Sequence, residues 1–207
     1  APAAGPGTHY GFRAAGEFAP ERSLWFDPAK LLVDPHAVEL DRRFVQAPQL
    51  AQYGVDSASF VPRAIVPGPL PEVPLSPPRF ARGGLIYELN VRGFTMLHPQ
   101  VPPEQRGTVA ALAHPAVIGH LQALHVSAVE LMPVIAWIDE RHLPPLGLTN
   151  GWGYNPVAPM ALDPGLCPGG VAELRETVAA LHTAGIGVIL DIVLNHTGES
   201  HVQGGTL

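Results

Sequence analysis

The chain has 207 residues, 46% of them hydrophobic, so it can bury the core of one or two domains. Its 12 basic and 18 acidic residues give a formal charge of -6, which disfavours nucleic acid as a partner. No apolar run reaches the roughly 18 residues that span a bilayer, and the N-terminus lacks the basic head and apolar core of a secretion signal. We therefore expect no membrane partner and a cytoplasmic location, while the oligomeric state stays open.

The single cysteine and the first residues bear on the context of the chain. One thiol, Cys167, excludes an internal disulfide framework, and we interpret it as having no functional role. The chain starts at Ala1, not at Met, and residues 1–7 show no core pattern. This predicts that the sequence begins partway through a longer protein.

Residues 8–40 alternate short β-like pieces with turn residues. The segment 8–13 has the pattern of a strand, and Asp27-Pro28 and Asp34-Pro35 have the pattern of turns. Two or three strands bury too little surface to be stable alone. Residues 1–45 are therefore predicted to be the end of a β-sandwich domain.

Residues 46–84 carry many prolines, which favour an extended backbone without hydrogen-bond donors. Such a segment is typical of a semi-rigid spacer. We expect a connector laid over a domain surface.

From Gly84 on, strands and helices alternate. Apolar runs over 85–91 and 126–134 and after Gly185 predict three strands, and apolar residues at helical spacing predict a helix after Pro115 and another closed by Gly185. Near-continuous apolar strands between helices indicate a parallel sheet. Because no G-x-G-x-x-G follows the first strand, a barrel is favoured over a nucleotide-binding fold.

Residues 135–170 form an unusually long loop between the second strand and its helix. Within it, Asn150-Gly-Trp-Gly-Tyr-Asn-Pro156 combines aromatic rings with amides. Aromatic faces stack on sugar rings, and amides can donate to and accept from hydroxyl groups. The segment is therefore either a carbohydrate site or an aromatic plug that closes a turn.

Polar residues within and after the strands are candidates for chemistry. Asp191 interrupts an apolar strand, which predicts either a supporting carboxylate of a site or a cap of a neighbouring loop. Alternation places His196 on the other side of an ideal strand, so both can face one site only if the strand ends before Asn195. Glu88 and Glu130 are buried-strand carboxylates that could be acid/base groups or structural partners.

Four segments in this order resemble the α-amylase superfamily of glycoside hydrolases, on its glycogen-debranching and isoamylase-like branch. They are Leu85-Ile-Tyr-Glu-Leu-Asn-Val-Arg-Gly-Phe-Thr95, Val129-Glu-Leu-Met-Pro-Val134, Trp152-Gly-Tyr-Asn-Pro156 and Asp191-Ile-Val-Leu-Asn-His196. Residues 8–40 look like the end of the β-sandwich carbohydrate-binding module that precedes the catalytic barrel in these enzymes.

The resemblance implies an α/β fold with three regions: the end of the carbohydrate-binding module over 1–45, a connector over 46–84, and the first three β/α units of a truncated (β/α)8 barrel over 85–207. It implies hydrolysis of α-1,6 branch linkages of glycogen or limit dextrin, with retention. Retaining enzymes use two carboxyl groups about 5 to 5.5 Å apart. In the family these come from the fourth and fifth strands, so we expect this chain to be inactive alone.

The same resemblance implies which residues contact the substrate. Asp191 and His196 match supporting residues of the catalytic cluster, and the His donates to the sugar at the cleavage point. Tyr154 matches an aromatic that stacks on that sugar, and the remaining substrate-binding candidates are Trp152, Asn155 and Asn195. No metal or cofactor is expected, because debranching relatives commonly lack the calcium ion that Asn195 would suggest. Asn90 stands where many relatives have His, and its role is left open.

The expected partner is an α-glucan: glycogen, limit dextrin or malto-oligosaccharides. A branching enzyme or a maltooligosyl-trehalose hydrolase of the same superfamily remains an alternative. So does a non-catalytic glycan-binding module.

Overall fold

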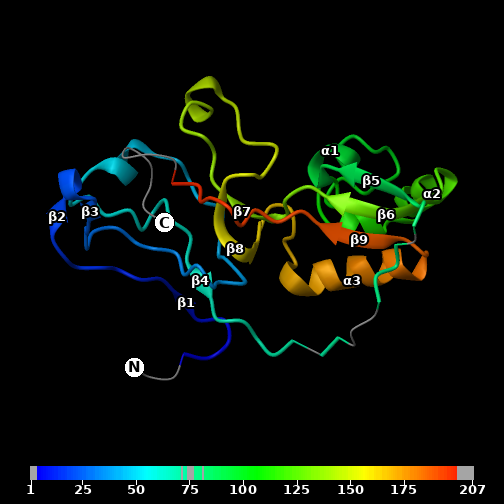
Figure 1. Ribbon diagram of the computed structural model, residues 1–207, viewed down its shortest axis with the longest axis horizontal. Helices are drawn as coiled ribbons and strands as arrows, with labels where there is room; N and C mark the ends of the chain where they lie inside the picture. Colours follow the sequence, from blue (N-terminus) through cyan, green and yellow to red (C-terminus); the bar gives the residue numbers. More distant parts are fainter. Residues whose placement is uncertain (1–3, 71, 74–76, 81, 200–207) are drawn as a thin grey trace. The chain divides into compact units, whose positions relative to one another are not determined.

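The computed structural model describes residues 4–70, 72–73, 77–80 and 82–199 (Figure 1). Parts of the expected connector, at 71, 74–76 and 81, and the end of the expected barrel region, at 200–207, lie outside these residues. The chain forms two compact units. One comprises Ala1–Gly68, Ile135–Ala161 and Val193–Leu207, and the other comprises Pro69–Val134 and Leu162–Ile192.

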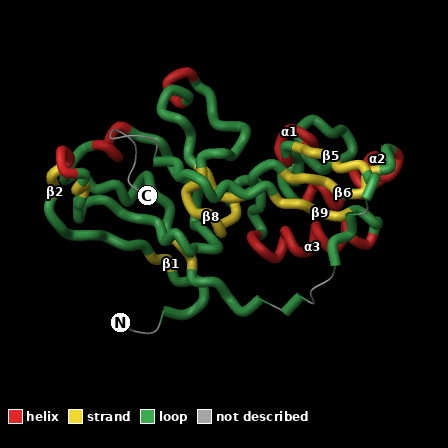
Figure 2. The backbone as a smooth tube through the Cα atoms, in the orientation of Figure 1, coloured by secondary structure: helices red, strands yellow, loops and turns green. Residues whose placement is uncertain are grey.

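The first unit, here called the N-terminal unit, is built mostly of loops tied by short strands (Figure 2). Strand β1 pairs antiparallel with β4, and β2 pairs antiparallel with β3. Strands β7 and β8 form a third pair. The strands are β1 (His9–Tyr10), β2 (Phe18–Ala19), β3 (Leu24–Trp25), β4 (Ala64–Ile65), β7 (Ile135–Trp137) and β8 (Pro156–Leu162).

One buried cluster holds the N-terminal unit together. Its members come from residues 31–64 and from the β7–β8 pair, and include Val61 and Ala64, which are both fully buried. The expected connector over 46–84 therefore needs correction over 46–66. The prolines there alternate with apolar residues that pack into the core, and β4 pairs with β1.

The second unit, here called the sheet unit, contains three parallel strands in the order β5-β6-β9. They are β5 (Leu85–Leu89), β6 (Val126–Leu131) and β9 (Gly187–Leu190). The helices are α1 (Val91–Thr95), α2 (Pro115–Ala123) and α3 (Gly170–Thr183), and α3 runs beside β9 (Figure 1). The order of the strands in the sheet follows the order in the chain, as repeated β/α units require.

Local signals set the helix ends. Pro115 begins α2, and the N–H of Ala116 donates to Nδ1 of His114 at 3.2 Å. The predicted cap at Gly185 is confirmed: its φ is +81°, its N–H donates to the carbonyl of His182, and the N–H of Ile186 donates to that of Leu181. These two bonds form a Schellman motif, which satisfies carbonyl groups that the helix end leaves open.

Two predicted strands are shorter than expected. The first ends at Leu89 because Asn90 begins α1, where its Oδ1 accepts from the N–H of Gly93 at 2.8 Å. This cap is a role for Asn90 that the sequence left open. The second ends at Leu131, two residues before Pro133, which has no N–H to donate.

The expected loop over 135–170 contains the β7–β8 pair. The N–H of Ile138 donates to the carbonyl of Asn155, and the N–H of Asp163 donates to that of Val134. The sum of the partner numbers is nearly constant, as in an antiparallel pair. The prolines at 156 and 159 hid β8 from the sequence pattern, although two-stranded ribbons tolerate proline at positions that donate no ladder bond.

Candidate functional site

The segment from Asn150 to Asn155 borders an open cavity of about 500 Å³ in the N-terminal unit. The indole of Trp152 is 70% exposed, and Tyr154 is half-buried. Both rings line the cavity, together with polar side chains that the sequence did not single out. The lining residues are Glu140, His142, Leu143, Thr149, Asn150, Gly151, Trp152 and Tyr154.

Asn150 shapes the turn that carries Trp152. Its Oδ1 accepts from the N–H of Trp152 at 2.8 Å and from that of Gly153 at 3.0 Å. Its Nδ2 donates to Oε1 of Glu140 at 3.0 Å. The turn also needs a glycine at 153, where φ is +82°.

His196 lies against the same turn. Its Nε2 is 2.7 Å from the carbonyl oxygen of Tyr154. Two residues later, the N–H of Gly198 donates to the carbonyl of Pro156 at 2.8 Å. A Cβ at Gly198 would lie 2.6 Å from Cγ2 of Ile138 and 2.9 Å from the carbonyl oxygen of Asn155, so only glycine permits this close approach.

Asn155 faces the end of β7. Its Nδ2 donates to the carbonyl of Ile138 at 3.2 Å, while its own carbonyl accepts from the N–H of Ile138. The side chain therefore supports the start of β8. Asn195, next to His196, is exposed.

The structure thus brings Trp152, Tyr154, Asn155 and His196 together in one unit. Asp191 belongs to the sheet unit, where it follows β9 directly. Its N–H donates to the carbonyl of Leu131 at 3.0 Å. The strand has ended before Asn195, which is the condition that the sequence set for Asp191 and His196 to face one site.

The strand carboxylates differ from expectation. Glu88 on β5 is exposed and Glu130 on β6 is half-buried, whereas the sequence predicted both to be buried. They are register partners across the two strands. An edge strand shields its side chains less than a central strand, which accounts for the difference.

Cys167 is buried, and its Sγ donates to the carbonyl of Gly170 at 3.1 Å. Burial, with the nearby Glu173 carboxylate, raises the pKa of this thiol to about 12. The thiol therefore stays protonated at neutral pH and is a poor nucleophile.

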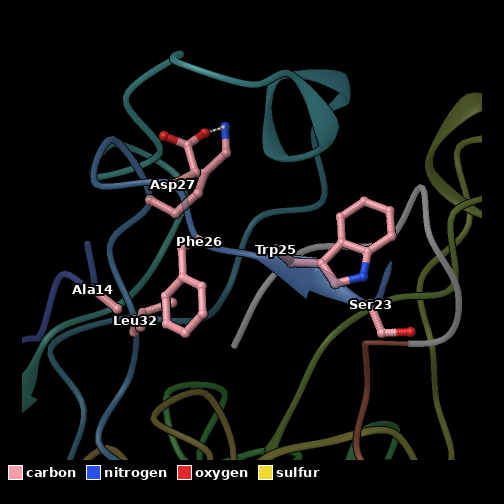
Figure 3. A pocket seen from close by; sticks show the side chains of 7 residues that line it. Ala14, Ser23, Trp25, Phe26, Asp27 and Leu32 are labelled. Atoms are coloured by element: carbon pink, nitrogen blue, oxygen red, sulfur yellow. Dashed lines mark ion pairs between the residues drawn. The ribbon is translucent and has the colours of Figure 1, made fainter. Parts of the chain in front are cut away.

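A second cavity, of about 240 Å³, lies near β3 in the N-terminal unit (Figure 3). Its walls are mainly apolar, with Phe26 and Leu32 on one side. Its two charged groups are already engaged. Nζ of Lys30 is 3.8 Å from Oδ2 of Asp27 and donates to three main-chain carbonyl groups, and Asp27 accepts from two main-chain N–H groups. These charges stabilise the loop at 49–55 and offer little to a ligand.

Two searches of the described residues gave negative results. Among residues 4–70, 72–73, 77–80 and 82–199, no group of three or more His, Cys, Asp or Glu side chains could hold a metal ion. In the same part of the chain, none of the helices has the length and apolar character needed to cross a membrane.

Comparison with known proteins identifies relatives of the whole chain. The glycogen debranching enzyme of Yersinia pseudotuberculosis serotype IB (strain PB1/+) is 46% identical over 224 aligned residues, which cover 100% of this chain and 33% of the relative. The chain thus spans about a third of the length of the curated relatives it matches. No family model matches the chain.

Solved structures agree. The chain matches the pullulanase SAP of Group B Streptococcus with a TM-score of 0.62 and 26% identity, over 83% of this chain and 24% of that one. The same pullulanase in complex with maltotetraose matches with a TM-score of 0.59 and 26% identity, over 83% and 24%. The resemblance that the sequence motifs indicated is confirmed: the chain belongs to the glycogen debranching enzymes of the α-amylase superfamily.

Proposed function

We propose that this chain forms part of a glycogen debranching enzyme and that it binds an α-glucan at the Trp152–Tyr154 turn, next to His196. The observation that carries the proposal is the contact between His196 and the carbonyl oxygen of Tyr154, which fixes a polar ring beside two aromatic rings at an open cavity. Maltotetraose in the complex of the streptococcal pullulanase supports an α-glucan as the ligand. In the same proposal, β5, β6 and β9 are the first three strands of a (β/α)8 barrel, and residues 1–45 end a carbohydrate-binding module.

The proposed contribution of this chain is to hold and orient the sugar at the cleavage point. The exposed Trp152 indole and the Tyr154 ring offer apolar faces to the sugar rings. Asp191 would support the catalytic cluster, and Asn195 would reach a sugar hydroxyl.

The Tyr154 carbonyl constrains how His196 can act. A carbonyl oxygen only accepts, so the hydrogen-bond network assigns the proton to Nε2. In the neutral ring, Nδ1 then accepts from a sugar hydroxyl. Donation to the sugar from Nδ1, as the resemblance implied, requires the imidazolium form.

Isothermal titration of the 207-residue chain with maltoheptaose tests the proposal. Wild type should bind, and Trp152→Ala should weaken binding about tenfold because a stacking face is lost. Trp25→Ala, which removes an exposed indole from a different part of the N-terminal unit, is the matched control and should bind as wild type does. Absence of binding by folded wild type, or an equal loss in both variants, would contradict the proposal.

A further inference from the structure

Asn150 stands out in its loop because it is buried while its neighbours are not. Its side chain and backbone are only 8% exposed, whereas Gly151 and Trp152 are exposed. An amide at this depth must find partners for both its oxygen and its nitrogen, since an unmade bond costs the full desolvation of the group. Asn150 finds them in two different places.

The oxygen of Asn150 serves the turn ahead of it. Two successive main-chain N–H groups, of Trp152 and Gly153, converge on this one atom at 2.8 and 3.0 Å. An aspartate could accept both bonds as well. An alanine could accept neither, which would leave the buried N–H of Gly153 without this acceptor.

The nitrogen atoms of Asn150 tie the turn to the segment that follows β7. Its main-chain N–H donates to Oδ1 of Asp139 at 2.7 Å, and its Nδ2 donates to Oε1 of Glu140 at 3.0 Å. Oε2 of Glu140 is buried and, within the described part of the chain, has no hydrogen-bond partner. The Asn150 bond is thus the one that holds this carboxylate.

The anchoring segment is itself fixed. Ile138 is 1% exposed and belongs to the core, and the carbonyl of Asp139 accepts from Nε2 of Gln46 at 3.2 Å. The far end of the turn reaches the same segment through Asn155 and Ile138. Trp152 and Tyr154 therefore sit between two anchors on one rigid support, an arrangement that holds binding groups in place before a ligand arrives.

We propose that Asn150 is a positioning residue for α-glucan binding: through its paired bonds to the turn and to Glu140, it holds Trp152 and Tyr154 in the orientation that a sugar chain needs. This inference rests on the proposed function, because the ligand is the same. Asn150 itself is not required to touch the sugar.

Reversal of one hydrogen bond provides the test. Asn150→Asp keeps the acceptor for the turn but sets a second carboxylate against Glu140, where like charges repel. It should weaken maltoheptaose binding about tenfold. In the double variant Asn150→Asp with Glu140→Gln, the Gln amide donates to the new carboxylate, so affinity should return to within about threefold of wild type.

Matched controls separate this pair from general effects of charge. Asn90→Asp adds the same charge at the cap of α1, where Asp and Asn cap equally well, and should leave binding unchanged. Glu140→Gln alone should bind nearly as wild type does, because its oxygen can still accept from Asn150. If the double variant binds as poorly as Asn150→Asp, or if Asn150→Asp binds as wild type does, the proposal is overturned.

A second readout does not need sugar. In the chain labelled with 5-fluorotryptophan, the Trp152 ¹⁹F resonance is identified by its loss in Trp152→Phe. Asn150→Asp should shift or broaden this resonance while those of Trp25 and Trp137 stay in place, and the double variant should restore it. An unmoved Trp152 resonance overturns the positioning role. A moved resonance in a chain that binds no maltoheptaose instead contradicts the proposed function, and with it the glucan part of this inference.

Discussion

Asn150 and His196 contact the same short turn at different main-chain groups: Asn150 accepts from the N–H groups of Trp152 and Gly153, and His196 contacts the carbonyl of Tyr154. Single polar side chains thus fix a loop that has no regular secondary structure. The sequence suggested Trp152 and Tyr154 because aromatic residues between glycines are a local signal. It could not suggest Asn150, because the Glu140 that completes its role lies ten residues away in a different segment.

A second polar residue, Asp34, makes stability depend on pH. The N–H of His36 and then the hydroxyl of Tyr10 donate to this carboxylate, at 2.9 and 2.7 Å, and both bonds lower the pKa of Asp34 below its ordinary value of 3.8. The same contact raises the pKa of Tyr10. For a lowered carboxyl pKa, the stabilisation is complete above the ordinary value and is lost as pH falls through the lowered value.

Tyr10→Phe should therefore lower the free energy of unfolding by about 1 kcal/mol at pH 7, because it removes a bond to a charged acceptor. The difference from wild type should narrow as pH falls below 3.8, since Asp34 then becomes protonated. Urea unfolding at pH 7 and at acid pH measures both values. Tyr53→Phe, at a ring that is 59% exposed, is the control and should change little. A gap that widens toward acid pH would contradict this account.

At the scale of elements, the sheet unit followed its sequence pattern closely. β6 and α3 show clear apolar periodicity, and Gly185 marks the end of α3, so their existence could be predicted from local residues. The N-terminal unit could not be predicted so well. Proline at 156 and 159 disguised β8, and the prolines around Val61 suggested a connector where the chain packs into a core. Such contacts join segments distant in sequence, and local propensity does not encode them.

The end of α3 allows an experiment with two glycines of opposite character. Gly185 has a φ of +81°, so Gly185→Ala should lower the free energy of unfolding by about 1 kcal/mol. Gly119 lies inside α2, and a Cβ there would meet no atom within 4 Å. Gly119→Ala should raise the free energy of unfolding by about 0.5–1 kcal/mol, because alanine is the better helix former. Denaturation followed by far-UV circular dichroism compares the two variants, and the same sign for both would refute this assignment of the helix end.

At the scale of the whole molecule, the two compact units carry different parts of the proposed site. The N-terminal unit carries Trp152, Tyr154, Asn155 and His196, and the sheet unit carries Asp191 at the end of β9. The carboxyl ends of parallel strands are where barrel enzymes of this architecture place their chemistry. The long insertion between β6 and α3 therefore supplies the proposed sugar-binding surface, while the sheet supplies a supporting carboxylate.

The central claim is that this chain holds an α-glucan between the Trp152–Tyr154 turn and His196. A crystal structure of the chain with maltotetraose tests it most directly. The account predicts density for glucosyl rings against the rings of Trp152 and Tyr154, with a sugar hydroxyl at Nδ1 of His196. Maltotetraose bound only elsewhere, for instance in the cavity beside Phe26, or a folded chain with no bound sugar at saturating concentration, would contradict the account.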